Sequence, residues 1–166
     1  NDTQVMEEKT LSEESRKAME EMEIQKDGMM KEMDDAMMES MKTMNFDFSG
    51  ALIDVTKSQT IRATVFDGNS SGTAQSNFNE SGYNLLVEFG NIPDPSGTDF
   101  YEGWIVRKSP FHVISTGKVT LVDGVYQNAY ASGQNLSDHD FYVLTLEPDD
   151  NDPAPADHIL EGTMMK

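Results

Sequence analysis

The sequence predicts a mainly β protein: an antiparallel β-sandwich, Ig-like or jelly-roll-like, preceded by an N-terminal amphipathic, Met-rich α-helical segment. Residues 1–44 hold ten of the twelve Met and no Pro or aromatic residue. From Phe46 onward come all the Phe, Tyr and Trp and every Pro, in short β-branched and aromatic runs separated by Gly, Asn and Asp. Such runs are typical of strands joined by turns. We therefore expect a helical segment at 1–45 and a sandwich domain at 46–166.

The helical segment is expected to begin at "TLSEES", where Thr10 can cap the helix and Glu13 can complete a capping box. At about 100° per residue, most of the Met side chains fall on one stripe about 120° wide, opposite Glu, Lys and Asp. We call this set the Met stripe: Met19, Met22, Met29, Met30, Met33, Met37, Met41 and Met44. Met38 falls outside it, and Gly28 is a weak point at which the segment could divide into two helices.

Seven strands are predicted in the second region: Phe46–Thr56, Thr60–Phe66, Asn84–Phe89, Phe100–Arg107, His112–Leu121, Val125–Ala131 and Phe141–Glu147. In the first, a bulge near Gly50 would allow the apolar residues to share one face. The polar stretch 67–82 is expected to be a long connection or a poorly ordered edge. Asp123 and Gly124, between two strand-like runs, predict a tight hairpin.

The fourth predicted strand contains the chain's single Trp. Because side chains alternate along a strand, Tyr101 and Trp104 are expected on opposite faces. We assign Trp104 to the sandwich core rather than to a ligand platform, since large aromatic side chains usually pack in cores.

These motifs resemble the C-terminal, extracytoplasmic domain of the anti-sigma-K factor family. The matching features, spread over about residues 46–162, are "YEGWIV" after a Pro-containing loop, Gly117, the Gly124–Tyr126 hairpin, "TLEP" at Thr145–Pro148, and Leu160. The resemblance implies a β-sandwich outside the membrane, in a prokaryotic periplasmic, cell-surface or secreted protein. It does not imply sigma-factor control, because a Met-rich segment stands where the family has its sigma-binding and membrane parts.

Charge and composition exclude several classes of function. The net charge is −18 with a pI near 4.2, which repels phosphate backbones and makes nucleic-acid binding improbable. The chain has no Cys, which excludes disulfides and thiolate chemistry. No apolar run is long enough for a membrane span. The opening "NDTQVMEEK" lacks an initiating Met, so we expect a removed export signal, with a lipid anchor in the precursor as a further alternative.

The Met residues offer two functional readings, and a third reading is that the segment is only a linker or stalk that carries the sandwich. Thioethers at i, i+3 and i+4 can bind Cu(I) or Ag(I), and the candidate ligands are Met29, Met30, Met33, Met37, Met41 and Met44. The same side chains can instead pack on the sandwich, on a second copy or on a partner, since Met adapts to irregular surfaces. The segment has no His. We favour packing, with no resident cofactor, over a metal site.

Other candidate sites are weaker. The three histidines could converge on a divalent ion with neighbouring carboxylates, although none of their spacings is that of a dedicated site: His112, His139 and His158, with Asp138, Asp140 or Asp157. The loop with Asp149, Asp150, Asn151 and Asp152 could bind Ca²⁺ but lacks the EF-hand spacing. No catalytic motif appears. We expect a non-enzymatic extracytoplasmic interaction or structural module, with Cu(I)/Ag(I) binding as the alternative.

Overall fold

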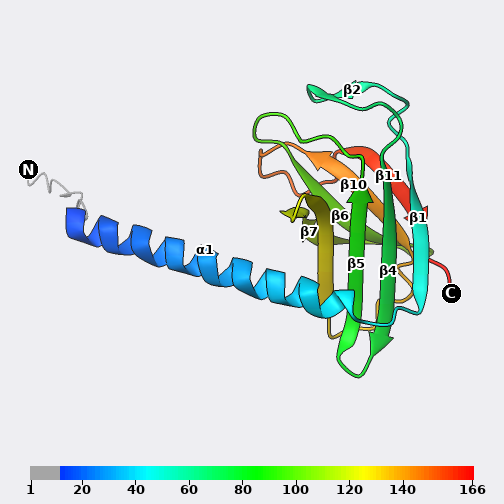
Figure 1. Ribbon diagram of the computed structural model, residues 1–166, viewed down its shortest axis with the longest axis horizontal. Helices are drawn as coiled ribbons and strands as arrows, with labels where there is room; N and C mark the ends of the chain where they lie inside the picture. The colour runs from blue at the N-terminus through cyan, green and yellow to red at the C-terminus, as the bar shows by residue number, and fades with distance from the viewer. Residues whose placement is uncertain (1–11) are drawn as a thin grey trace, which may run out of the picture. The chain divides into compact units, whose positions relative to one another are not determined.

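A computed structural model describes residues 12–166 and divides the chain into two compact units, one ending at Met37 and the other beginning at Met38 (Figure 1). Helix α1 (Glu13–Lys42) is continuous. Gly28 therefore does not divide it; one Gly costs a helix only about 1 kcal/mol relative to Ala. The predicted cap Thr10 lies outside the described residues. Ser12 fills that role, its Oγ accepting a hydrogen bond of 3.3 Å from the Ser15 amide.

The unit from Met38 onward is mainly β, which confirms the predicted fold class. Its strands are β1 (Phe48–Asp54), β2 (Thr60–Ile61), β3 (Thr64–Val65), β4 (Ser71–Asn79), β5 (Gly82–Gly90), β6 (Phe100–Lys108), β7 (Phe111–Lys118), β8 (Thr120–Val122), β9 (Val125–Ser132), β10 (Phe141–Glu147) and β11 (Asp157–Thr163). Among the described residues, no helix is both long enough and apolar enough to cross a membrane.

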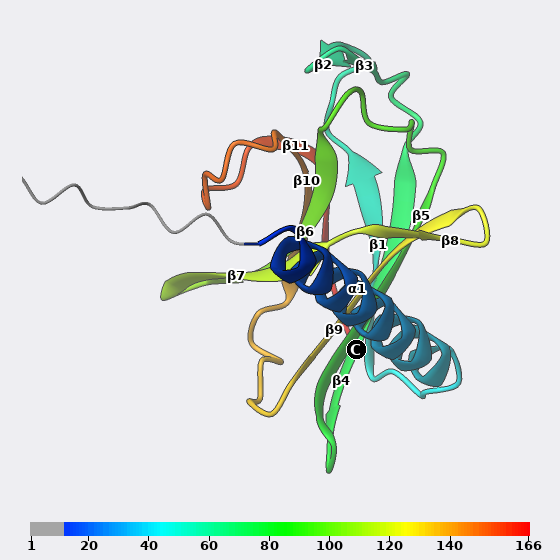
Figure 2. The same cartoon turned by 90° about the vertical axis from the view of Figure 1, so that its left-hand side faces the viewer.

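Nine strands form one antiparallel sheet in the order β7-β6-β10-β11-β1-β4-β5-β9-β8, and β2 pairs only with β3. The sheet folds over into two layers, with β1, β4 and β5 in front of β6, β10 and β11 (Figures 1 and 2). β7 meets β9 through side chains: Thr116 donates to Asn128 Oδ1 at 2.6 Å, and Tyr142 donates to the same oxygen at 2.9 Å. Gly103 faces this cluster, and a Cβ there would lie 2.2 Å from Asn128 Oδ1.

Two predicted strands are revised by the structure. The segment 60–66 is a hairpin of β2 and β3, with Arg62 and Ala63 at positive φ in its turn. The segment 112–121 is split between β7 and β8, with the break next to Gly117, whose φ is +89°. The predicted hairpin is confirmed: Val122 pairs with Val125, and Asp123 and Gly124 have the two positive φ angles of a type I′ turn.

Two further expectations about the sheet were wrong. The stretch expected as a long connection contains β4, which pairs with β1 and β5 on its two sides. Its inward residues, including Gly72 and Ala74, are small, so it lacks the large apolar alternation that marks a strand. No bulge occurs near Gly50, and β1 turns Leu52 inward and leaves Ile53 exposed.

Candidate functional site: an apolar outer sheet face

Strand β6 places its aromatic residues on opposite faces of the sheet, as predicted. Trp104 is buried, at 7% exposure, but in a second, smaller core cluster rather than in the main core between the layers. Tyr101 and Ile105 belong to the main core between the layers. Trp104 and Val106 point to the outer face and form a separate cluster with Val143. The Tyr101 hydroxyl donates to the Pro93 carbonyl at 2.8 Å, so its ring packs in the main core with its polar group satisfied.

Strand register extends this outer face across five strands. Ile53 pairs with Glu161, Glu161 with Val143, and Val143 with Trp104, so one row crosses β1, β11, β10 and β6. Directly paired residues share a face of the sheet. A second row joins Phe141 to Val106 and continues to β7. We call the apolar members of these rows, with Phe111, the outer apolar face: Ile53, Trp104, Val106, Phe111, Val113, Phe141 and Val143.

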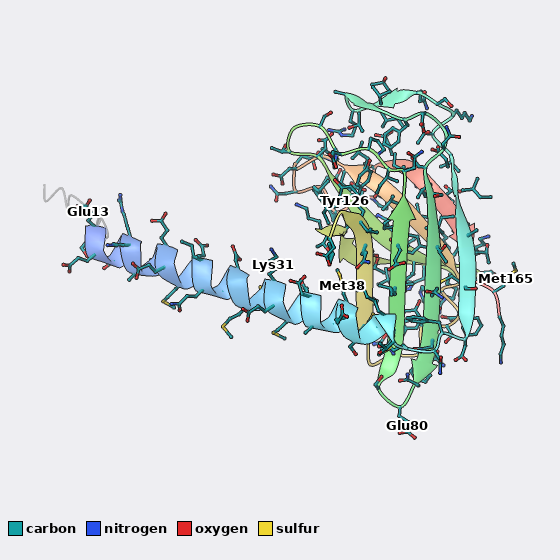
Figure 3. All side chains as sticks on the ribbon, viewed as in Figure 1. Glu13, Lys31, Met38, Glu80, Tyr126 and Met165 are labelled. Carbon is teal, nitrogen blue, oxygen red and sulfur yellow. The ribbon has the colours of Figure 1, made fainter. Side chains whose placement is uncertain are left out.

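The outer apolar face is most exposed at its two ends, whereas Trp104, Val106 and Val143 between them are 4–8% exposed. Phe111 is 75% exposed and Ile53 is 69% exposed, although Ile53 lies within a paired strand. A cavity of about 180 Å³ opens over Trp104 between Phe111 and Phe141, and its wall is almost entirely apolar. A shallower hollow continues from Phe141 to Ile53 and Met165, whose side chain projects outward beside β1 (Figure 3). Contiguous exposed apolar surface of this kind is typical of contact sites.

A chain of hydrogen bonds fixes the floor of the cavity. Trp104 Nε1 donates to Thr145 Oγ1 at 2.8 Å, and the Thr145 hydroxyl donates in turn to the Glu147 carboxylate. Glu147 is only 3% exposed and also accepts the Ala156 amide at 2.8 Å. The loop that joins Glu147 to Ala156 contains Pro155, which lines the cavity. The indole is thus held in place from β10 and from the loop after it.

The structure divides the Met stripe into exposed and buried parts. Five of its members are between 55% and 71% exposed: Met19, Met22, Met29, Met30 and Met33. Met37 and Met44 are partly exposed, and Met41 is 1% exposed. Of the candidate metal ligands, Met29, Met30 and Met33 therefore have accessible sulfurs on consecutive turns, whereas the sulfur of Met41 belongs to a packed contact.

Met38, which the sequence placed outside the stripe, is also buried, at 5% exposure. Its sulfur accepts a hydrogen bond of 3.8 Å from the Thr120 hydroxyl on β8. Three residues apart, Met38 and Met41 lie about 60° from one another on the helix. In the last turns of α1, the buried side chains therefore come from the edge of the Met stripe rather than from its middle. Leu86 on β5, which points away from the main core, is buried as well.

Two of the three histidines come together. His112 Nδ1 lies 2.8 Å from His139 Nε2, and His139 Nδ1 lies 2.7 Å from Asp138 Oδ1. Arg107 donates to the other oxygen of Asp138 at 3.0 Å, and this hydrogen bond lowers the pKa of Asp138. Sequence spacing gave no signal for the pair, because β7 and the segment before β10 meet only in the fold.

The remaining predicted ligands stay apart from that pair. His158 Nδ1 lies instead 2.7 Å from Glu161 Oε1. In the acidic loop, Asp150 and Asp152 each accept a backbone amide two residues ahead at 3.0 Å, as in ordinary Asx turns. Across residues 12–166, no group of three or more His, Asp or Glu side chains is placed to hold one metal ion.

No family model matches the chain, and neither a curated protein nor a solved structure matches it.

Proposed function

We propose that this protein is a non-enzymatic, extracytoplasmic interaction module whose Met-rich helix contacts a second copy or another protein. One observation carries the proposal: five Met side chains stand exposed on one side of a helix whose other surfaces are charged. Fully burying such a side chain contributes roughly 1.5–3 kcal/mol before ordering costs. A complex in which a partner covers the stripe is stabilised by this burial free energy at several Met side chains.

The extracytoplasmic setting rests on the resemblance of residues 46–162 to the outer domain of the anti-sigma-K factor family. The sandwich architecture agrees with that resemblance. A chain without Cys is also compatible with either redox environment. Sigma-factor control is not part of the proposal, because the resemblance covers none of the residues that such control needs.

A second candidate function is Cu(I) or Ag(I) binding. It is favoured by Met29, Met30 and Met33, whose exposed thioethers are spaced to reach one ion. Thioether sulfur is the ligand that soft monovalent ions prefer. This reading needs the sulfur atoms themselves, whereas packing needs only apolar side chains of similar volume.

The two functions are separated by substitutions at Met22, Met29 and Met33, which are 65–71% exposed and lie within about 40° of one another on the helix. A triple Met→Leu variant keeps the apolar surface and removes the sulfur, and a triple Met→Ser variant removes both. Under the interaction proposal, sedimentation shows the wild-type assembly for the Leu variant and dispersal for the Ser variant.

Titration with Cu(I) against a competing chelator completes the test. Stoichiometric binding that both triple variants abolish would establish the metal function. If the wild type assembles and the Ser variant sediments like it, with the same helix content by circular dichroism, the stripe is not the contact surface between copies and the interaction proposal fails for a second copy. Ile24→Ser is the matched control, since Ile24 is 66% exposed but lies off the stripe.

A further inference from the structure

We infer that the partner of the Met stripe is the outer apolar face of a second copy of this chain, in a head-to-tail contact. This inference rests on the proposed interaction function and names the surface that completes it. Each copy then offers one donor surface, the helix, and one acceptor surface, the sheet face. Three observations point to this pairing.

The two surfaces match in size. From Met19 to Met33 the exposed stripe spans fifteen residues, and the fourteen steps between its ends measure about 21 Å at 1.5 Å each. The outer apolar face runs from β7 to β1 over four strand spacings, or about 19 Å at roughly 4.8 Å each. A helix lying across the strands can therefore engage the whole face with successive turns.

The two surfaces also match in shape and chemistry. The cavity over Trp104, about 180 Å³ in volume, is narrow and apolar, and unbranched Met side chains fill irregular apolar hollows well. Sulfur next to an aromatic ring gains additional attraction, and the cavity offers the rings of Trp104, Phe111 and Phe141. Two Met side chains of this chain, Met38 and Met41 in the last turns of α1, are themselves buried.

Charge favours the same pairing. Carboxylates outnumber cations in residues 12–37, so the helix is acidic. On the face, the ammonium of Lys108 lies 4.2 Å from the centre of the Phe141 ring, and that of Lys118 lies 4.9 Å from the centre of the Phe100 ring. Neither lysine forms an ion pair with any described residue. Both are thus available to an acidic helix.

The carboxylates on this side of the sheet are already engaged, and Glu147 is buried beneath the cavity with Thr145 and Ala156 as its donors. Glu102 accepts a hydrogen bond from the Ser115 hydroxyl, and Glu161 lies 2.7 Å from a nitrogen of His158. The face is therefore an apolar strip with cations at its margin, in a chain whose net charge is −18. Such local complementarity steers the helix toward this face rather than toward the acidic remainder of the surface.

A head-to-tail contact uses two different surfaces, so it does not close at two copies unless the geometry forms a ring. The expected behaviour of the full chain is growth with concentration into chains or a closed ring. Two identical helices pairing with one another would instead stop at a dimer or another small bundle and would leave the sheet face free.

The experiment uses two variants of the full chain in sedimentation velocity. The face variant carries Ile53→Glu and Phe111→Glu, both at exposed positions where folding is little affected. The helix variant carries Met→Ser at Met22, Met29 and Met33. Each variant alone is expected to remain a monomer, with association weakened at least about tenfold. Mixed together they are expected to form a one-to-one dimer that grows no further, because each supplies the surface that the other lacks.

Matched controls keep the charge change but move it off the face: Val65→Glu on β3 and Leu121→Glu on β8, at 70% and 56% exposure. Both should assemble like wild type. The single Trp adds a local readout, since the fluorescence of Trp104 should change on assembly of the wild type and in the mixture but not in either variant alone.

Three results would overturn the inference. A monomeric wild type at all concentrations excludes the contact between copies. A face variant that still assembles points to helix–helix pairing, which leaves the interaction proposal intact and refutes this partner. A mixture that stays monomeric shows that the two surfaces do not bind one another, even if each variant has lost assembly. Dispersal by the helix variant alone thus supports the proposed function without supporting this inference.

Discussion

Replacing Thr145 by Val removes one hydroxyl from the hydrogen-bond chain beneath the outer apolar face and leaves the side-chain shape nearly unchanged. Thr145 is fully buried and stands between the Trp104 indole nitrogen and the Glu147 carboxylate. In the variant the indole N–H loses its acceptor, which costs about 1–3 kcal/mol for a buried donor. The carboxylate loses a donor worth about 1.5–3 kcal/mol and keeps only the Ala156 amide.

Because the two losses share one hydroxyl they do not add fully, and we expect a net destabilisation of about 2–4 kcal/mol. The assay is urea denaturation of the full chain followed by Trp104 fluorescence, which reports on the sandwich alone because the chain has one Trp. With a urea slope of about 1–3 kcal/mol/M, the midpoint should fall by roughly 1–2 M at unchanged slope.

The control is Thr145→Ser, which keeps the hydroxyl and loses one methyl, at about 1 kcal/mol. If the Val and Ser variants lose equal stability, the methyl rather than the hydroxyl stabilises this site, and the reasoning is refuted. A Val variant within about 0.5 kcal/mol of wild type would refute it as well, since that is the usual scatter of neutral substitutions.

Three further predictions concern the same unit. Gly103→Ala should destabilise the fold by several kcal/mol in urea denaturation, since its Cβ would lie 2.2–2.5 Å from three buried polar groups, and intact stability would show that the cluster can yield. Met41→Ala should cost about 2–5 kcal/mol, whereas Met29→Ala should cost almost nothing in the monomer; similar losses would contradict the observed burial. Burial raises the pKa of Asp54, but hydrogen bonds from Thr56 and Ser70 outweigh it and bring the pKa below 3.8, so its contribution to stability is present at neutral pH and lost as the pH falls below that value. Thermal melts of Asp54→Asn should therefore lie below wild type at pH 7 and approach it as the pH falls well below 3.8, and a constant difference would contradict this linkage.

The sequence was sufficient for the fold class, because that depends on local patterns. The contrast between residues 1–44 and the rest separates helix from strand, and Asp123-Gly124 specifies its hairpin through two positive φ angles that few other residue pairs adopt. The sequence did not predict strand β4, because the inward positions of this strand include Gly72 and Ala74. Small residues there make room for the large side chains of neighbouring strands, and apolar periodicity then disappears from the sequence.

The candidate site could be predicted only in part. Alternation correctly separates Tyr101 from Trp104, but it does not say which of the two faces is the inside. That choice depends on where each polar group finds a partner. The Tyr101 hydroxyl reaches the Pro93 carbonyl, eight residues earlier, and the Trp104 nitrogen reaches Thr145, 41 residues later. Side-chain size correctly predicted that Trp104 is buried, but not that it lies in the smaller cluster on the other face of β6 from Tyr101.

The exposed part of α1 has few tertiary contacts to stabilise it. Between Ser12 and Ala36 nearly every side chain of α1 is exposed, so this stretch is stabilised chiefly by its own backbone hydrogen bonds and its Ser12 cap. Helices of that length without tertiary packing are marginal in water, and Gly28 weakens this one further. A partner that covers Met22, Met29 and Met33 would therefore stabilise the helix as well as bury its sulfurs. Assembly and helix formation are expected to be thermodynamically linked, because the same contact contributes to both.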